Sequence, residues 1–177
     1  MSGLAQWREE PIGRHHNRDE FDCGSVELNE YLQRTARQNH ETGGAKTFVA
    51  ASVLEPASVF GYYSISPASI AFASVPRDVT RKLGRYDVPV FRLGRLAVSI
   101  SMQGRGLGGD LLLCAGLRAL AVASEVGGVA LAIDAKDKRA AAWYERFGAL
   151  HLLDDSLKLI LPLATIASAM RPEKRKR

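Results

Sequence analysis

The sequence predicts an α+β layer fold, in which helices cover a mixed β-sheet. The 177 residues are 46% apolar and 24% charged, which is the composition of one globular domain with a sizeable core. In the second half of the chain, apolar segments of strand and helix length alternate, as is typical of α/β and α+β layers. Glycine pairs and prolines separate these segments. The composition excludes a disordered chain, a collagen-like repeat and a disulfide-stabilised miniprotein.

The first half of the chain predicts one helix followed by a β-hairpin. Ser25 is expected to cap the helix, because its hydroxyl can accept a hydrogen bond from the first turn. An apolar stripe that begins at Leu28 continues the helix to the glycine pair at 43–44. Two segments rich in strand-forming residues follow, 47–54 and 58–65, and the Glu-Pro-Ala between them favours a hairpin.

The second half predicts four strands and two helices behind a polar segment. Residues 67–89 contain three prolines and several basic side chains, so we expect a loop with one short helix. The segment 106–125 is apolar all round, which predicts a helix buried against the sheet. Strands are expected at 90–99, 129–133, 150–153 and 157–161, and the second helix at 137–147.

Charge and cysteine content limit the location of the protein. The net charge is +5, of which +4 lies in the last seven residues. We expect one domain over residues 1–162 and a basic C-terminal tail over 163–177. The N-terminus lacks a basic start with an apolar block behind it, and no apolar stretch approaches the roughly 18 residues of a membrane span. With two cysteines in no metal-ligand spacing, the sequence predicts a reduced, cytoplasmic protein with no metal site and no membrane segment.

Basic side chains gather in the segment that leads into the strand at 90–99. A local basic stripe attracts a polyanion, and either a nucleotide cofactor or a nucleic acid would fit it. Each of these side chains alone is equally well explained as a solvated surface charge. The basic stripe consists of Arg77, Arg81, Lys82, Arg85 and Arg92.

A glycine-rich turn between a strand and the long apolar helix is the most informative segment. Gly104, Gly106 and Gly109 let a bound group approach the backbone, and the helix N-terminus presents N–H donors and a partial positive charge. Arg105 adds a full charge, so the turn suits a pyrophosphate. The Gly-Lys-Ser/Thr end of a nucleotide-hydrolysing loop is missing, and Glu125 lies at a helix end instead of the strand end that a dinucleotide fingerprint requires. The alternative is a flexible connection without a ligand.

Beyond the turn, the sequence resembles the GNAT acetyltransferase family. Gln103, Gly106 and Gly108 match the family's acyl-CoA pyrophosphate motif, Gln/Arg-x-x-Gly-x-Gly/Ala. Tyr144 begins a match to the Tyr-x-x-x-Gly-Phe region, in which Ala149 replaces the usual phenylalanine.

An N-terminal signature narrows the resemblance to one branch. The runs Phe-Asp-Cys-Gly at 21–24, Leu-Asn-Glu-Tyr-Leu at 28–32 and Thr-Phe-Val at 47–49 are similar to the GNAT toxins of bacterial toxin–antitoxin pairs. The similarity covers roughly residues 5–162. It implies the GNAT fold, with α/β/α layers and a mixed, mostly antiparallel sheet that is splayed between its fourth and fifth strands.

The resemblance also implies acetyl-CoA as the co-substrate. Backbone groups of the fourth strand would pair with the peptide-like pantetheine arm, and the glycine-rich turn would hold the pyrophosphate. The N–H of Val98 would stabilise the thioester oxyanion. A helix cap is the alternative role for Asp137. The residues implied in cofactor binding are Leu96, Ala97, Val98, Gln103, Gly104, Arg105, Gly106, Leu107, Gly108, Gly109 and Asp137.

Acetyl transfer needs a proton for the leaving thiolate, and the family match assigns its donation to Tyr144. The alternative is that Tyr144, Trp143 and Phe147 form a core face of one helix. No histidine stands out as a general base. Because the reference pKa of an α-amino group is about 7.7–8.0, against about 10.4 for lysine, an α-amine needs less help with deprotonation. The resemblance and this difference both favour an aminoacyl-tRNA as the acetyl acceptor, and we expect this tRNA to bind the basic stripe.

The resemblance therefore implies a toxin that acetylates aminoacyl-tRNA and inhibits translation. It also implies a ribbon–helix–helix antitoxin, a homodimer, and contact with DNA only through the antitoxin. Two alternatives stay open. One is a GNAT enzyme that acetylates a small-molecule or protein amine, and the other is an inactive acyl-CoA-binding partner in a repressor complex. The basic stripe and tail favour the toxin over the first, and Tyr144 with the intact pyrophosphate motif favours an enzyme over the second.

Overall fold

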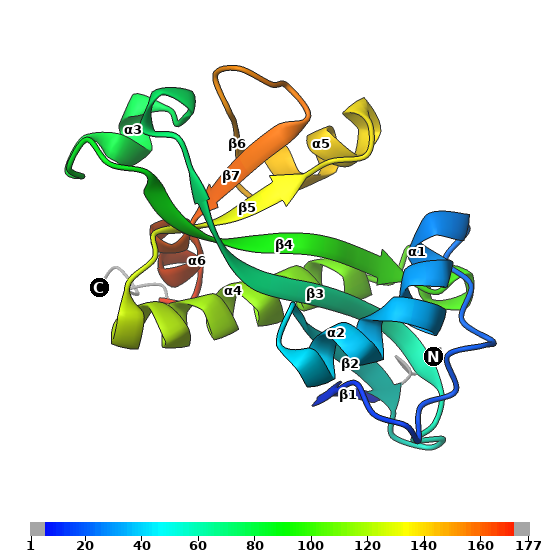
Figure 1. Ribbon diagram of the computed structural model, residues 1–177. Helices are drawn as coiled ribbons and strands as arrows, with labels where there is room; N and C mark the ends of the chain where they lie inside the picture. Colours follow the sequence, from blue (N-terminus) through cyan, green and yellow to red (C-terminus); the bar gives the residue numbers. More distant parts are fainter. Residues whose placement is uncertain (1–5, 172–177) are drawn as a thin grey trace, which may run out of the picture. The chain divides into compact units, whose positions relative to one another are not determined.

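The computed structural model describes residues 6–171 and has an α+β fold (Figure 1). Seven strands form a mixed sheet in the order β1-β2-β3-β4-β5-β7-β6, in which β4 and β5 run parallel. The strands are β1 (Trp7–Pro11), β2 (Lys46–Ser52), β3 (Val59–Ile70), β4 (Val88–Val98), β5 (Ala130–Asp134), β6 (Leu150–His151) and β7 (Lys158–Pro162). The helices are α1 (Val26–Glu30), α2 (Ala36–Thr42), α3 (Arg77–Thr80), α4 (Leu107–Val126), α5 (Lys138–Glu145) and α6 (Leu163–Ala169), with a π-helical turn at Tyr31–Thr35 and short 3₁₀ turns at Phe72–Ser74 and Ile100–Met102.

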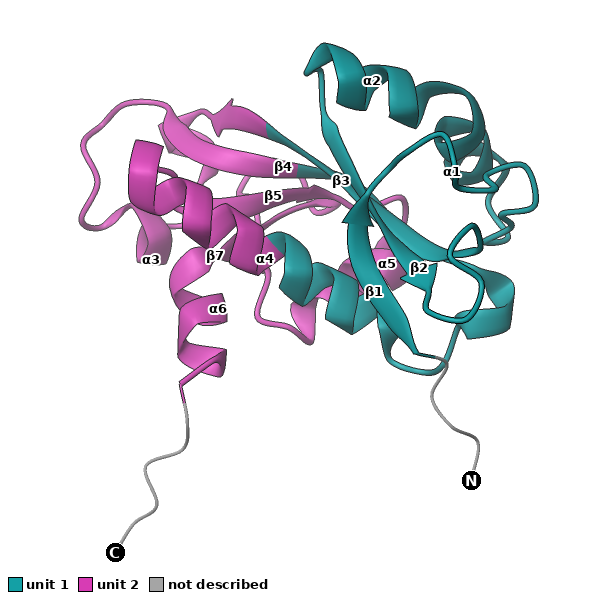
Figure 2. Cartoon of the chain, turned by 90° about the horizontal axis from the view of Figure 1, so that it is seen from below, with its two compact units in different colours: residues 1–66, 93–115 teal, residues 67–92, 116–177 magenta. Residues whose placement is uncertain are grey.

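The chain divides into two compact units (Figure 2). Unit 1 consists of residues 1–66 and 93–115, and unit 2 of residues 67–92 and 116–177. The strands β3 and β4 and the helix α4 each begin in one unit and end in the other. Each unit has a hydrophobic core of its own.

In unit 1, helices pack on both faces of the sheet. Adjacent strand residues point to opposite faces, and β3 shows this clearly. Tyr62 packs in the same buried cluster as Tyr31 from the helical segment before β2. The preceding residue, Gly61, faces α4. A Cβ added there would lie 2.9 Å from Leu111 Cδ1 and 2.8 Å from the carbonyl oxygen of Ala97. This close approach explains the glycine inside the strand.

The helical segment before β2 contains a π-helical turn. As expected, α1 begins behind Ser25, whose hydroxyl accepts a hydrogen bond from the N–H of Leu28. The turn at Tyr31–Thr35 inserts one extra residue into the helix, and such turns are frequent at functional sites. The segment ends at Gly43, whose φ of 84° lies in the left-handed region that favours glycine.

In unit 2, β5 and β7 pair in antiparallel register, with Leu131 opposite Leu161. On one face of these strands, apolar side chains of the segment 68–83 pack against alternate residues of β4, β5 and β7. The residues between them, including Leu131 and Leu161, are buried on the opposite face. There α6 approaches α4 so closely that a Cβ added at Gly116 would overlap the side chain of Ile166.

The helix α4 confirms the expectation of a long apolar helix after the glycine-rich turn. By length and composition alone, it is the one helix among residues 6–171 that could cross a membrane. The core helix of a folded protein passes the same test. Because Leu111 and Ala115 have no exposed surface, we assign α4 to the core.

Three features depart from the sequence predictions. The strand β1 lies in a segment for which no strand was expected, and β3 continues to residue 70. Within the segment expected as a C-terminal tail, 163–177, the chain continues after β7 as α6, with Leu163 and Ile166 buried. The side chain of Ile166 contacts α4, so residues 163–169 belong to the folded part. The basic residues of the expected tail at 172–177 lie outside the described residues.

Candidate active site

The end of β4 holds the three residues expected to face the pantetheine arm. Ala97 is buried in the core cluster of unit 1, so Leu96 and Val98, which are half-buried, point to the opposite face of the strand. Directly after the strand, the N–H of Ser99 donates a hydrogen bond of 2.8 Å to the carbonyl oxygen of Phe60. This bond fixes the direction in which the chain leaves β4.

The glycine-rich turn follows and takes a backbone shape that glycine favours. Gly104 and Gly106 have φ angles of 75° and 88°, in the left-handed region. A Cβ added at either position would meet nothing within 4 Å. Backbone conformation, and not crowding by the protein, therefore accounts for glycine here, and the space beside the turn is open to a ligand.

The N-terminus of α4 opens directly behind the turn. The N–H of Asp110 donates to the carbonyl oxygen of Gly106 at 3.1 Å and makes the first hydrogen bond of the helix. The N–H groups of Leu107, Gly108 and Gly109 come before it, so they have no acceptor inside the helix. These donors, the positive end of the helix dipole and the exposed Arg105 suit an anion such as a pyrophosphate.

Gln103 connects the turn to two other segments. Its side-chain Nε2 donates a 2.9 Å hydrogen bond to the carbonyl oxygen of Val98 and a 3.0 Å bond to that of Cys23. Gln103 was predicted as a cofactor-binding residue. Its amide nitrogen links the end of β4 to an N-terminal loop and so holds the turn in place.

The N-terminal loop at residues 21–24 supports the turn from the other side. One oxygen of Asp22, Oδ1, accepts hydrogen bonds from the N–H of Gly24 and from Asn29 Nδ2, and both lower the pKa of this carboxyl. The carbonyl oxygen of Asp22 accepts a 2.8 Å bond from the N–H of Ile100. An Asp two residues before a Gly is a readable turn signal, but its contact with residue 100 is not evident from the sequence.

Tyr144, the predicted acid, lies on α5 in unit 2. Its ring makes an edge contact with Trp143 at 4.9 Å between centroids, and Trp143 also contacts Phe147 at 4.7 Å. The three aromatic residues thus form one cluster, but none of them is fully buried, and Phe147 is 40% exposed. Tyr144 is half-buried, and burial raises the pKa of its phenol above the ordinary value of 10. The phenol is therefore protonated at neutral pH, and it is a weaker acid than a free phenol.

Two aspartates near α5 have structural partners. Asp137, predicted to contact the cofactor, caps α5, because its Oδ1 accepts a 2.8 Å hydrogen bond from the N–H of Ala140. Asp134 forms an ion pair with Arg92 at 3.1 Å. Arg92 was predicted to belong to the tRNA-binding stripe, and this pairing offsets part of its charge.

The rest of the basic stripe is exposed in unit 2. Arg77 lies on α3, and Arg81, Lys82 and Arg85 lie in the loop between α3 and β4. Arg81 makes an ion pair of 3.4 Å with Asp78, in which both side chains are largely exposed, so that pair contributes little. These charges are accessible to a polyanion.

His151 links β6 to the end of α5. Its Nδ1 lies 2.6 Å from the carbonyl oxygen of Ser156, and its Nε2 contacts the carboxylate of Glu145, the residue after Tyr144. Because both ring nitrogens face acceptors, the protonated form is favoured. The hydrogen bond to Glu145 is the largest cause that raises the pKa of His151 above 6.5.

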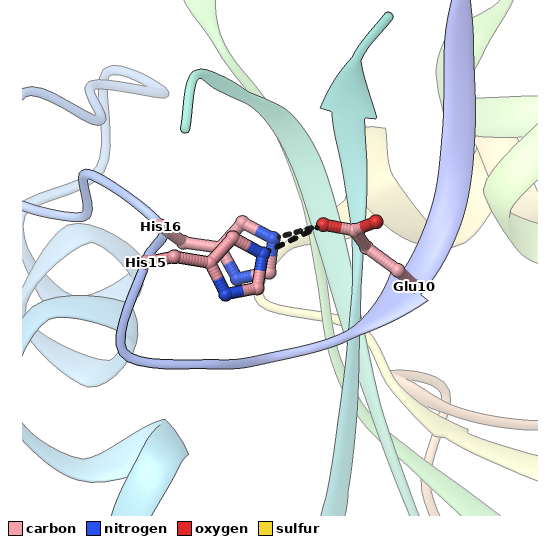
Figure 3. Close-up of side chains that lie close together, drawn as sticks. All are labelled: Glu10, His15 and His16. Atoms are coloured by element: carbon pink, nitrogen blue, oxygen red, sulfur yellow. Dashed lines mark hydrogen bonds and ion pairs between the residues drawn. The ribbon is translucent and has the colours of Figure 1, made fainter. Parts of the chain in front are cut away.

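A cluster of Glu10, His15 and His16 lies beside β1 (Figure 3). Glu10 Oε1 lies 3.0 Å from Nε2 of His15 and 2.6 Å from Nε2 of His16, so the three ligand-type atoms are within 4.8 Å of one another. However, Nδ1 of His16 accepts a 2.9 Å hydrogen bond from the N–H of Gly13. A neutral imidazole has one free lone pair, so Nε2 of His16 carries the proton and donates it to Glu10. We therefore interpret the cluster as a hydrogen-bonded group and not as a metal site.

A second feature that the sequence did not reveal is the contact of Arg95 with Tyr31. The guanidinium carbon lies 3.7 Å from the ring centroid, a cation–π geometry. Arg95 projects from β4 and Tyr31 begins the π-helical turn. This contact joins β4, the strand that leads to the glycine-rich turn, with the helical segment before β2.

The predicted site residues thus fall into two groups. Unit 1 brings together the end of β4, the turn and the start of α4, which is the part expected to bind the cofactor. Unit 2 carries the predicted acid, the helix cap of α5 and the basic stripe.

Two curated relatives match most of the chain, whereas no protein-family model matches it. A tRNA-acetylating toxin of Mycobacterium tuberculosis is 36% identical over 141 residues, which cover 80% of this chain and 82% of the toxin. A probable toxin TacT of Sinorhizobium fredii is 27% identical in an alignment of 178 positions that covers 96% of this chain and 98% of the relative.

Solved structures share the fold over nearly the whole chain. A crystal structure of a tyrosine-to-phenylalanine mutant of KacT has a TM-score of 0.87 and 26% identity, and the match covers 93% of this chain and 99% of KacT. AtaT complexed with acetyl-methionyl-tRNAfMet has a TM-score of 0.87 and 23% identity, over 94% of this chain and 100% of AtaT. AtaT has also been solved with its antitoxin AtaR and acetyl-CoA, and KacT with its partner and DNA.

Proposed function

The chain belongs to the family of tRNA-acetylating toxins, and from this premise we infer that it is an acetyltransferase of the GNAT fold that acetylates aminoacyl-tRNA with acetyl-CoA. The acetyl group goes to the α-amino group of the esterified amino acid, and the modified tRNA no longer supports translation. The relationship to the mycobacterial toxin, at 36% identity over four-fifths of the chain, supports this function.

One observation of the structure carries the cofactor assignment. Gly104 and Gly106, in left-handed conformations with open space beside them, stand directly before the N–H donors that begin the 20-residue helix α4. The pyrophosphate of acetyl-CoA is the anion that this arrangement fits. The N–H groups of Leu107, Gly108 and Gly109 would bind it, and Arg105 would add a charge.

The reaction requires the α-amine to attack the thioester carbonyl carbon. The carbonyl oxygen becomes an oxyanion, for which the N–H of Val98 is the proposed donor. When the carbon–sulfur bond breaks, the thiolate takes a proton, which we assign to the phenol of Tyr144. The attacking nitrogen loses a proton to water as the amide forms, and water returns a proton to the phenol. The phenol of Tyr144 is protonated at neutral pH and so carries the proton that the thiolate takes, although burial makes it a weaker acid than a free phenol. A free α-amine is partly neutral at physiological pH, so the enzyme needs no strong base to prepare it.

The partners follow from the family. Toxins of this fold have been solved with an antitoxin and, in the KacT complex, also with DNA. An antitoxin would therefore bind this chain, and we propose that it is a ribbon–helix–helix protein that supplies the contact with DNA. We also propose a homodimer and a cytoplasmic location, where charged tRNA is found.

The direct test is acetyl transfer from labelled acetyl-CoA to bulk charged tRNA. Label should remain with the amino acid after hydrolysis of the ester, and it should be absent when the tRNA is deacylated beforehand. Label on small amines or on proteins, with none on charged tRNA, would contradict the proposed substrate.

A further inference from the structure

The most exposed aromatic side chain in residues 6–171 is Tyr86, with 82% of its surface accessible. It lies in the loop between α3 and β4, within unit 2. A single exposed apolar side chain is ordinary on a protein surface. The surroundings of Tyr86 are what distinguish it.

One edge of the ring of Tyr86 lies beside Gly84 of its own loop. A Cβ added at Gly84 would lie 3.1 Å from Cδ2 and 3.2 Å from Cε2 of the ring, so one edge of the ring rests on the backbone of Gly84. The remainder of the ring is exposed. The exposed part of the ring is accessible to a second planar group that could stack on it.

Positive charge surrounds this ring. Between residues 77 and 87, the chain has four basic and two acidic side chains, and all six are exposed. Arg85 directly precedes Tyr86, and Lys82 lies four residues before it. Basic residues interleaved with an exposed aromatic ring are the combination with which proteins bind single-stranded nucleic acid, since the cations bind phosphates and the ring stacks on a base.

We propose that Tyr86 stacks on an unpaired nucleobase of the tRNA substrate, while Arg81, Lys82 and Arg85 contact the adjacent phosphates. This inference rests on the proposed function, because that function supplies the nucleic acid. The base must be unpaired, because the faces of paired bases are stacked on their neighbours in a helix. Tyr86 is thus assigned to substrate binding and takes no part in the chemistry.

The test uses salt dependence to separate stacking from charge. The affinity for bulk tRNA is measured at several salt concentrations for the wild type and for Tyr86→Ala, Tyr86→Phe and Arg81→Ala. Tyr86→Ala should weaken binding roughly 5- to 100-fold at every salt concentration and leave the slope of affinity against salt unchanged. Tyr86→Phe keeps the ring and should retain wild-type affinity. Arg81→Ala should reduce the slope by about 0.7–0.9, as expected for one lost phosphate contact.

Two controls complete the experiment. Leu54, which is 88% exposed on the β2–β3 hairpin, is the matched apolar residue, and Leu54→Ala should leave tRNA affinity unchanged. A blunt RNA duplex offers no unpaired base, so it should bind the wild type and Tyr86→Ala equally.

Three results would overturn the stacking proposal. The first is that the wild type and Tyr86→Ala bind tRNA with equal affinity. The second is that Tyr86→Phe loses as much tRNA affinity as Tyr86→Ala does. The third is that Tyr86→Ala binds the antitoxin more weakly while its tRNA affinity is unchanged. The wild type is assayed in parallel for acetylation of charged tRNA. If it acetylates charged tRNA while Tyr86→Ala binds normally, only the stacking proposal fails. If the wild type does not acetylate charged tRNA, the proposed function itself fails.

Discussion

The side-chain amide nitrogen of Gln103 lies 2.9 Å from the carbonyl oxygen of Val98, so the residue that begins the glycine-rich turn is bound to the end of the preceding strand. The same nitrogen donates to Cys23, which places three segments of unit 1 at one point. Gln103 matches the cofactor motif of the family, and its side chain holds the backbone of the glycine-rich turn in place.

Replacing Gln103 with leucine should weaken acetyl-CoA binding, because the turn loses both anchors. The free energy of unfolding should fall by about 1–2 kcal/mol for two partly exposed hydrogen bonds. Gln33 is a matched control, since its Nε2 also faces two carbonyl oxygens, of Asp19 and Phe21, at 3.4 Å. Gln33→Leu should lower stability and leave acetyl-CoA affinity intact. Calorimetric titration that shows equal affinity for both variants would contradict the anchoring role.

Gly106→Glu should abolish acetyl-CoA binding while the chain stays folded, because the new carboxylate would occupy the pyrophosphate position. The substitution also strains the backbone, so its control must carry the same strain. Gly43 provides it, with a φ of 84° and nothing within 4 Å of an added Cβ. Gly43→Glu should show a similar loss of thermal stability and bind acetyl-CoA like the wild type. Unchanged calorimetric affinity in a folded Gly106→Glu protein would refute the assignment.

Tyr144→Phe should retain the fold and the affinity for acetyl-CoA and lose turnover by roughly 10²- to 10⁴-fold, the usual contribution of a general acid. The substitution removes one hydroxyl and little volume, so the aromatic cluster with Trp143 persists. Single-turnover acetylation of charged tRNA measures the effect. Because burial raises the pKa of Tyr144, the wild-type rate should not decline near pH 10 through loss of this proton. A near wild-type rate in the variant would leave Tyr144 as a packing residue only.

Arg81→Ala combined with Arg85→Ala should weaken tRNA binding and reduce its salt slope, because each lost phosphate contact removes about 0.7–0.9 from that slope. Arg92→Ala should reduce the slope less, since Asp134 already pairs with Arg92 at 3.1 Å. Affinity for acetyl-CoA should stay constant in all these variants. Identical slopes for the wild type and the double variant would show that this face does not bind tRNA.

Acid should destabilise the protein in two steps. Burial lowers the pKa of His16 below 6.5, so the unfolded chain takes up a proton first and stability declines as the pH falls below about 6.5. Hydrogen bonds from His15 and His16 and the Arg8 charge lower the pKa of Glu10 from 4.5 to about 2. Its contribution is complete above pH 4.5 and disappears as the pH falls towards 2.

The variant Glu10→Gln should be less stable than the wild type at pH 7, and its stability should change less between pH 4.5 and 2. Urea unfolding across this range measures the difference. Parallel pH profiles for the two proteins would exclude Glu10 as a source of the acid sensitivity.

The sequence predicted the elements whose structure depends on residues close together in the chain. The cap at Ser25 is confirmed, and so is the helix behind the glycine-rich turn, because both depend on neighbouring residues. The strand β1 carries charged residues, so the sequence shows no apolar pattern that would predict a strand there. Its position depends on pairing with β2, in which Glu9 lies opposite Ala50. The helix α6 is short, and its stabilising contact, Ile166 on Gly116, joins residues 50 positions apart.

The candidate site shows the same division. The turn and the possible cap at Asp137 could be predicted from spacing. The anchors of Gln103 and the cation–π contact of Arg95 with Tyr31 could not, because each joins residues that only the folded chain brings together.

Each of the two units is built from two separate segments of the chain, and this has a consequence for synthesis on the ribosome. Neither unit is a continuous stretch, since unit 1 needs residues up to 115 and unit 2 begins at 67. A nascent chain therefore lacks part of unit 1 until residue 115 is added, and it lacks core residues of unit 2 until Ile160 is added. Messages truncated before codon 160 should yield fragments without toxicity, because such fragments lack part of the core of unit 2.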